Sequence, residues 1–298
     1  SQRGKHIFPL FVSTDLPART RKPGQYNIDA NTVHGGHAAK VLEKTQAPTR
    51  AVLIDRDQQA IVCLTSKFQD NSPTIIKSDF WRATEDLANE EKQFDLILAD
   101  LGVSSPHLDM ASRGFSVMAD GPLDMRMDQS QELTAERVVN SYSEAELTRI
   151  LREYGEEPKA RSIAKLIVAN RPFTSTNELA KVVARAWSGP ATGKSRRHPA
   201  VRTFQALRIV VNNELEQVKN ALEKWFAMLT PGGRIVVISF HSLEDKIVKM
   251  AMKEVTGDRY DAPLRDLTHG PIMAGNIELA FNPRARSAKL RAAAKIKT

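Results

Sequence analysis

The chain has little cysteine and no long apolar run, and both absences restrict its class. The single cysteine, Cys63, excludes an intramolecular disulfide framework and a cysteine-rich zinc site. It lies between Val62 and Leu64, where we expect a buried structural thiol. No apolar stretch approaches the roughly 18–20 residues that span a bilayer. No charged-then-apolar leader starts at Ser1, so we expect no secretory signal and a reducing compartment.

Acidic residues are fewer than basic ones, at 35 against 43, which gives a net charge of +8 over 298 residues. The surplus lies mainly in residues 1–22 and 283–298, and a third basic cluster lies at residues 194–198. Basic segments on a nearly neutral body suit contacts with phosphate groups. A solvated, frayed terminus is the simpler alternative for either end, but three separate clusters favour a nucleic-acid partner.

Short apolar runs alternate with helical patterns in the first third of the chain and again in its last third. Strands are predicted at residues 26–30, 50–55, 74–77, 94–100 and 234–240. Helices are predicted at residues 38–44 and 58–68. This alternation is typical of a parallel sheet that is covered by helices on both faces.

The alternation stops between Pro106 and about Thr203, where only loops and helices are predicted. The helices are expected at residues 143–154, 159–170 and 176–187, and a continuous amphipathic helix is expected at residues 203–229. The chain is therefore divided into a first core part (1–105), an inserted helical substrate-recognition domain (106–203), and a second core part with a basic carboxyl-terminal tail (204–298).

Glycines, acids and an aromatic residue lie at or after the ends of several predicted strands, at the edge where open parallel sheets bind ligands. Gly35 and Gly36 follow the first strand, Asp55 ends the second, Phe80 follows the third, and Asp100 ends the fourth. Paired glycines let a ligand approach the backbone, although they also serve ordinary turns. Acids at successive strand ends favour a nucleoside-containing cofactor. No GxxxxGK[ST] or complete GxGxxG motif occurs, which argues against a nucleoside triphosphatase and a dinucleotide dehydrogenase.

Seven longer motifs make the sequence resemble the small-subunit ribosomal RNA cytosine-N4 methyltransferases. They are DLGVSSP at 100–106, RGFS at 113–116, DGPLDMRMD at 120–128, YGEE at 154–157, HPAVRTFQALR at 198–208, SFHSLED at 239–245 and NPRARS at 282–287. The resemblance runs in order over nearly the whole chain.

The resemblance implies an α/β fold, a Rossmann-like class I methyltransferase core with an inserted helical domain. It implies methylation of the exocyclic amine of one cytidine with S-adenosyl-L-methionine as the methyl donor. The expected partner is small-subunit ribosomal RNA or the assembling small subunit. The expected location is the bacterial cytoplasm, with a mitochondrion or plastid as the alternative.

The resemblance also implies a set of cofactor contacts: Gly35, Gly36, His37, Asp55, Phe80, Asp100 and His107. Several positions depart from the family pattern: Val33 replaces a usual glycine, Asn31 a usual threonine and His107 a usual glutamine, and Pro17 interrupts the usual amino-terminal helix. A branched side chain is poorly suited to a turn with positive φ. Val33 therefore motivates an alternative function, a catalytically weakened RNA-binding factor for ribosome assembly that retains the methyltransferase fold.

For the chemistry, Asp100 is the candidate catalytic residue, because the N4 amine must be aligned and must lose a proton. A carbonyl of residues 102–105 could take that proton instead, with Asp100 binding only the cofactor. The arginines expected to contact RNA phosphates are Arg197, Arg202, Arg284 and Arg286. Residues 242–245 are interpreted as a helix capping box, and the acids and arginines of residues 113–128 as an internally paired loop.

Overall fold

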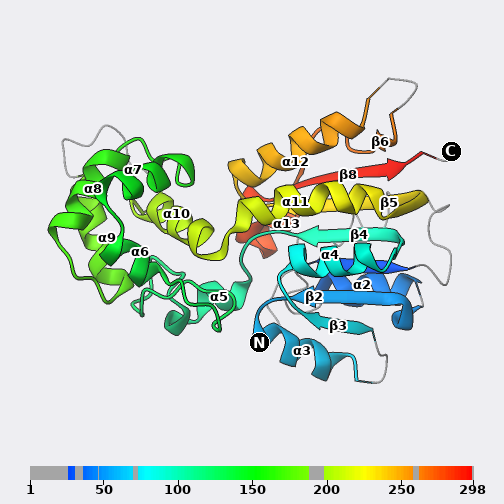
Figure 1. The fold of residues 1–298 in the computed structure, drawn as a ribbon, viewed down its shortest axis with the longest axis horizontal. Coiled ribbons are helices and arrows are strands. Elements are labelled where there is room, and N and C mark those ends of the chain that lie inside the picture. Colours follow the sequence, from blue (N-terminus) through cyan, green and yellow to red (C-terminus); the bar gives the residue numbers. More distant parts are fainter. Residues whose placement is uncertain are drawn as a thin grey trace. The chain divides into compact units, whose positions relative to one another are not determined.

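The computed structural model describes residues 26–30, 36–45, 47–69, 73–187, 198–257 and 262–296. These residues separate into two compact units (Figure 1). The first combines Ser1–Gly102 with Leu215–Thr298, and the second is Val103–Glu214. Among the described residues, no helix combines the length and apolar character that a membrane crossing requires. Val33, Gly35 and Arg197 lie outside the described residues.

The first unit contains a mixed sheet with the strand order β3-β2-β1-β4-β5-β8-β6, and β7 also pairs with β8. The strands are β1 (Asn27–Ala30), β2 (Ala51–Asp55), β3 (Thr74–Lys77), β4 (Phe94–Asp100), β5 (Leu229–Ser239), β6 (Leu264–Asp266), β7 (Ile272–Met273) and β8 (Lys289–Lys295). Neighbours from β3 to β5 are parallel, and β8 is antiparallel to β5. The strand order reverses between β1 and β4, so this fold places a ligand-binding edge there.

The helices of this unit are α2 (Gly36–Thr45), α3 (Gln58–Lys67), α4 (Phe80–Asn89), α11 (Glu214–Ala227), α12 (Ser242–Val255) and α13 (Asn276–Phe281). Asp57 caps α3 by accepting a hydrogen bond from the Gln59 amide at 2.8 Å. Its core includes Trp225, which is fully buried and donates from Nε1 to Thr84 Oγ1 at 2.9 Å. The five predicted strands and both predicted helices of the core are confirmed.

The second unit is helical, with α5 (Ser105–Asp109), α6 (Ala135–Ser141), α7 (Glu144–Glu153), α8 (Ala160–Ala169), α9 (Thr176–Arg185) and α10 (Val201–Asn212). Capping boxes fix the starts of α7 and α9, where Ser143 pairs with Glu146 and Ser175 with Glu178. The predicted insert, residues 106–203, lies within this unit, and its three predicted helices are α7, α8 and α9. The predicted fold class, a Rossmann-like core with an inserted helical domain, is confirmed.

The loop of residues 113–128 is internally paired, as its alternating charges predict. Arg126 binds Asp124 through two hydrogen bonds of 2.8 and 2.9 Å. The buried guanidinium of Arg113 donates from Nη2 to the carbonyls of Arg126 and Met127, at 2.9 and 3.0 Å. These bonds hold the loop from within.

Two predictions about the carboxyl-terminal third are wrong. The expected helix at 203–229 is two helices, because Asn213 adopts a left-handed conformation with φ of 50° and ends α10. Asparagine tolerates this conformation better than most residues. The expected basic tail also contains β8, an inner strand of the sheet whose central residues are buried. Alanine side chains let this strand fit between its neighbours, and two of its basic residues, Lys289 and Arg291, pair with an acid described below.

Candidate functional site

Three acidic side chains lie on one face of the sheet at the carboxyl ends of β2, β1 and β4. In the strand register, Asp29 is level with Leu53 of β2 and Leu98 of β4. Side chains alternate between faces along a strand, so Asp55 and Asp100, two residues further on, share the face of Asp29. The structure therefore brings together the two predicted acids and a third one that the strand-end pattern missed.

All three acids are buried, since Asp29, Asp55 and Asp100 are only 5%, 4% and 6% exposed. Burial raises the pKa of Asp29 well above its ordinary value, and the charges of Asp100 and Asp55 raise it further. Asp29 lines a small cavity with apolar residues that include Ala38 and Leu53. A cation at this edge would be stabilised by the cluster. The signal for Asp29 in the sequence was an acid next to the end of a predicted buried strand.

The start of α2 adds a histidine to this edge. Gly36 begins α2, and His37 follows it with Nε2 at 3.8 Å from Asp100 Oδ2. Asp55 is fixed on the other side, because its Oδ1 accepts a hydrogen bond from the Asp57 amide at 2.8 Å. Gly102 follows β4 with φ of 83°, a left-handed conformation that favours glycine and turns the chain directly after the acid.

Phe80 lies at the start of α4, after β3. Its ring packs against Trp225 with a centroid separation of 5.7 Å. The carboxylate of Asp79 caps α4 by accepting a hydrogen bond from the Arg82 amide at 2.8 Å. Phe80 is thus held by the core of the first unit, and its contact with a cofactor stays a prediction.

His107 belongs to the second unit, where it is 5% exposed. Its Nδ1 accepts a hydrogen bond from the Ser104 amide at 3.1 Å, which closes a capping box at the start of α5. Its ring also stacks on Phe115 with centroids 4.9 Å apart. Histidine can replace glutamine here because its ring nitrogen makes the same type of capping bond that a glutamine carbonyl oxygen can make.

The predicted RNA-contact arginines are distributed over both units. Arg202 is exposed in α10, and its Nη1 donates to the Glu156 carbonyl at 3.1 Å, so it also supports the loop after α7. Arg284 and Arg286 are exposed in the 3-10 helix η4 (Pro283–Ser287). Arg202 therefore belongs to the second unit, and the η4 arginines belong to the first.

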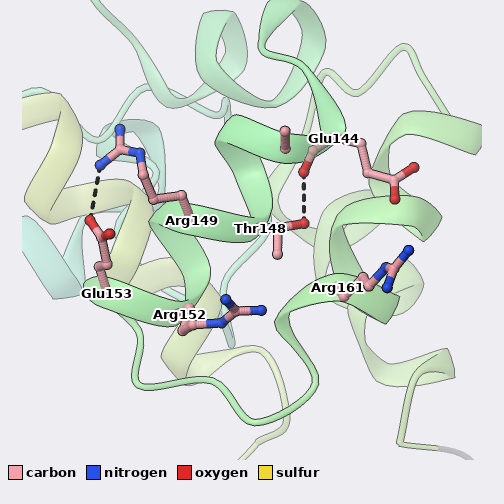
Figure 2. A pocket seen from close by; sticks show the side chains of 7 residues that line it. Glu144, Thr148, Arg149, Arg152, Glu153 and Arg161 are labelled. Carbon is pink, nitrogen blue, oxygen red and sulfur yellow. Dashed lines mark hydrogen bonds and ion pairs between the residues drawn. The ribbon is translucent and has the colours of Figure 1, made fainter.

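A pocket on the second unit contains further arginines, which the sequence did not single out. It is lined by Glu144, Ala145, Thr148, Arg149, Arg152, Glu153 and Arg161. Arg149 is paired with Glu153 at 2.9 Å. Within the described part of the chain, Arg152 of α7 and Arg161 of α8 have no hydrogen-bond or ion-pair partner, and Figure 2 shows them among the residues that line the hollow, together with Glu144. The hollow can therefore accept an anion.

The expected capping box at 242–245 is wrong by one residue. His241 is the N-cap of α12, and its Nδ1 accepts a hydrogen bond from the Glu244 amide at 3.4 Å. Asp245 is instead part of a buried ion cluster, in which Arg291 Nε and Lys289 Nζ of β8 lie 2.8 and 3.0 Å from its oxygens. The cluster explains how a strand with basic residues is accommodated inside the sheet.

Comparison with known proteins gives extensive similarity. Residues 5–296 match the MraW methylase family. A relative from Synechocystis sp., named ribosomal RNA small subunit methyltransferase H, is 47% identical over 285 residues, covering 92% of this chain and 88% of its own. A relative of the same name from Caldicellulosiruptor saccharolyticus is 45% identical over 312 residues, covering 98% of this chain and 99% of its own. An rRNA methylase structure from Streptococcus thermophilus aligns at 9% identity with a TM-score of 0.43, covering 94% and 91%.

Proposed function

Since this chain belongs to the MraW methylase family, we propose that it transfers a methyl group from S-adenosyl-L-methionine to the exocyclic N4 amine of a cytidine in small-subunit ribosomal RNA. The observation that carries the proposal is the set of buried acids at the carboxyl ends of β2, β1 and β4. The similar proteins named for ribosomal RNA methylation support the choice of substrate.

The acidic edge suits the chemistry of this cofactor. S-adenosylmethionine supplies an electrophilic methyl group on a positively charged sulfur when it is bound. The charges of Asp55 and Asp100, which raise the pKa of the neighbouring Asp29, make this buried edge electronegative and favour a cationic ligand over a neutral one. Asp55 is placed to accept hydrogen bonds from ribose hydroxyls, at the strand end where nucleoside cofactors are commonly held. Gly36 and His37 at the start of α2 complete the proposed cofactor side.

Asp100 is proposed to act on the cytosine. The lone pair of N4 is delocalised into the ring, so the amine is a weak nucleophile and needs alignment. The carboxylate of Asp100 accepts a hydrogen bond from N4–H, and this bond orients the amine. As the N–C bond forms and the cofactor's S–C bond breaks, the carboxylate receives the proton that leaves N4. A backbone carbonyl of residues 102–105 is the alternative acceptor, in which case Asp100 contacts only the cofactor.

The helical unit is proposed to hold the RNA. The support is the hollow beside α7 and α8, which Arg149, Arg152 and Arg161 line together with two glutamates (Figure 2). A guanidinium group matches the geometry of a phosphate through two parallel hydrogen bonds. The target base must also be presented unstacked, so contacts with the flanking backbone are needed to keep it open.

The proposed function is tested by mass spectrometry of small-subunit ribosomal RNA from cells that lack the protein. N4-methylcytidine should disappear at one position and return when the wild-type gene is restored. Purified protein, unmodified small subunits and labelled S-adenosylmethionine should reproduce the modification. An unchanged modification pattern in the deletion strain would exclude this function. The assembly-factor alternative finds no support in relatives that are all named methyltransferases, and it predicts no cofactor binding at all. The cytoplasmic location stays a prediction.

A first prediction concerns Asp55. Asp55→Ala should weaken S-adenosylmethionine binding by about 1–3 kcal/mol, the usual effect of losing a charged hydrogen-bond partner. Isothermal titration calorimetry measures it directly. Asp95→Ala is the matched control. Asp95 lies near the amino end of β4, at the edge of the sheet away from the site, where it accepts hydrogen bonds from Tyr26 and Thr230. Equal cofactor affinity in wild type and Asp55→Ala would remove Asp55 from the site.

A second prediction concerns the exposed arginines. Replacing Arg284 and Arg286 by glutamine should reduce the slope of log K against log salt for RNA binding by about one to two units. The same change at Arg152 and Arg161 should act similarly if the hollow holds phosphate. Arg137→Gln is the control, because Arg137 is an exposed arginine that already has an acidic neighbour, at 3.8 Å in Glu132. A pair whose loss leaves both slope and affinity unchanged makes no RNA contact.

A further inference from the structure

The short helix α13 exposes two large apolar side chains on one face. Phe281 is 88% exposed and Ile277 is 81% exposed, values at the top of the range for large apolar residues in the described chain. They are four residues apart, which places them one turn apart on the same side of the helix. Met273 of β7, just before α13, is also exposed. Figure 1 shows α13 within the first unit.

The opposite side of α13 is anchored, so this exposure is not that of a detached segment. Leu279 packs against a buried cluster that includes Ala285 and Leu290 of the following elements. The Asn282 amide donates to the Glu278 carbonyl at 2.7 Å, and the Ala285 amide donates to the Asn282 carbonyl at 3.0 Å. These bonds join α13 directly to η4 and hold the apolar face outward.

Positive charge adjoins this face through η4. Ala285 is fully buried, whereas Arg284 and Arg286 on either side of it are exposed. The nearest acid in sequence, Glu278, is half-buried, and burial raises the pKa of its carboxyl. The exposed charges beside the apolar face are therefore the two guanidinium groups of η4.

We propose that Phe281, Ile277, Arg284 and Arg286 form a stacking platform for an unpaired base of RNA, with Phe281 against the base and the arginines on the neighbouring phosphates. The proposal rests on the proposed function only in taking RNA as the ligand. Proteins that bind single strands combine aromatic rings for stacking with cationic groups that follow the backbone. A duplex keeps the faces of its bases covered, so the platform should distinguish single-stranded from paired RNA.

The experiment measures binding by fluorescence anisotropy, with an unstructured RNA of about 16 nucleotides and with its duplex. Phe281→Ala should weaken binding of the single strand about 5- to 100-fold, the effect of losing one stacked base. Duplex binding should change by less than about twofold, and the salt slope should stay the same because no charge is lost. Phe281→Trp should retain the single-strand affinity, because indole also stacks.

Met250→Ala is the matched control, since Met250 is 54% exposed and lies in α12 of the first unit, outside the proposed RNA contacts. Its RNA affinity should equal that of wild type. Thermal melting checks that each variant is folded, which a fully exposed side chain should not affect. Binding is measured without cofactor, so the platform is tested independently of methyl transfer. A platform that binds single strands while no N4-methylcytidine is produced would leave this inference standing and overturn the proposed function.

Two outcomes overturn the platform. Equal losses for single-stranded and duplex RNA, or no loss for either, would show that Phe281 does not stack on a base. Sedimentation analysis tests a contact between copies of the chain. If Phe281→Ala forms a smaller oligomer than wild type and keeps its RNA affinity per protomer, the apolar face belongs to that contact and not to RNA.

Discussion

The Asp100→Asn variant should slow single-turnover methylation by about 10²–10⁴, the usual range for a positioned acid–base group. Asparagine keeps the size of the side chain but cannot receive the N4 proton. It also removes a negative charge from a site where Asp100 is 6% exposed and His37 Nε2 lies 3.8 Å away. Rapid-quench measurement with saturating cofactor and RNA isolates the chemical step.

The comparison that decides the role of Asp100 is rate against affinity. If Asp100 acts on the cytosine, cofactor affinity should fall far less than the rate does. A loss of cofactor affinity as large as the loss of rate, with the rate restored at saturation, would make Asp100 a cofactor ligand only. Asp95→Asn is the control on the same strand, because its side chain holds Tyr26 and Thr230 at the amino end of β4 and should not affect the rate.

The second large effect is on stability. Asp245→Ala should lower the free energy of unfolding by about 3–5 kcal/mol, because it leaves buried positive charge without its partner. Asp245 and Arg291 are 8% and 9% exposed, and Arg291 Nε lies 2.8 Å from the Asp245 carboxylate. Urea denaturation followed by circular dichroism measures the change. Adding Arg291→Met to Asp245→Ala should recover part of the loss, because it removes the unpaired charge.

The loss from Asp245→Ala should depend on pH in a defined direction. Burial alone would raise the pKa of Asp245, but hydrogen bonds and charges from Arg291 and Lys289 outweigh it and lower the pKa below the ordinary 3.8. A lowered pKa in the folded state means that the stabilisation is complete above the unfolded value and disappears as pH falls through the folded value. The difference between variant and wild type should therefore be constant near neutral pH and shrink in acid. A difference that persists undiminished at low pH would assign the effect to packing.

Local sequence was sufficient for strands β1 to β5, for helices such as α3, α7 and α9, and for the acids at the ends of β2 and β4. It did not predict β6, β7 or β8. Residues 94–100, for example, are mostly apolar, as a strand covered by helices on both faces requires. Gly102 then turns the chain. Because parallel strands share one edge, Asp55 and Asp100 could be expected together before any coordinates were known. The fold class follows from the same alternation of strands and helices.

The ends of two helices depended on a single residue whose effect the apolar periodicity does not show. The apolar period of residues 203–229 continues through Asn213, yet the left-handed backbone there ends α10. The capping box of α12 starts at His241 because an imidazole nitrogen can accept the amide bond as a serine oxygen can, which a search for Ser or Thr passes over.

Apolar periodicity along the chain predicted many of the secondary-structure elements. Contacts between distant residues decided which charged groups are buried or paired and which apolar side chains stay exposed. Asp29 acquires its raised pKa only because α2 and the neighbouring strands bury it beside Asp55 and Asp100. Lys289 and Arg291 are accommodated in an inner strand because the carboxylate of Asp245 pairs with both of them. The exposure of Phe281 likewise depends on which side of α13 packs on the core. Burial and charge pairing are properties of the assembled fold, so the sequence alone could not supply them.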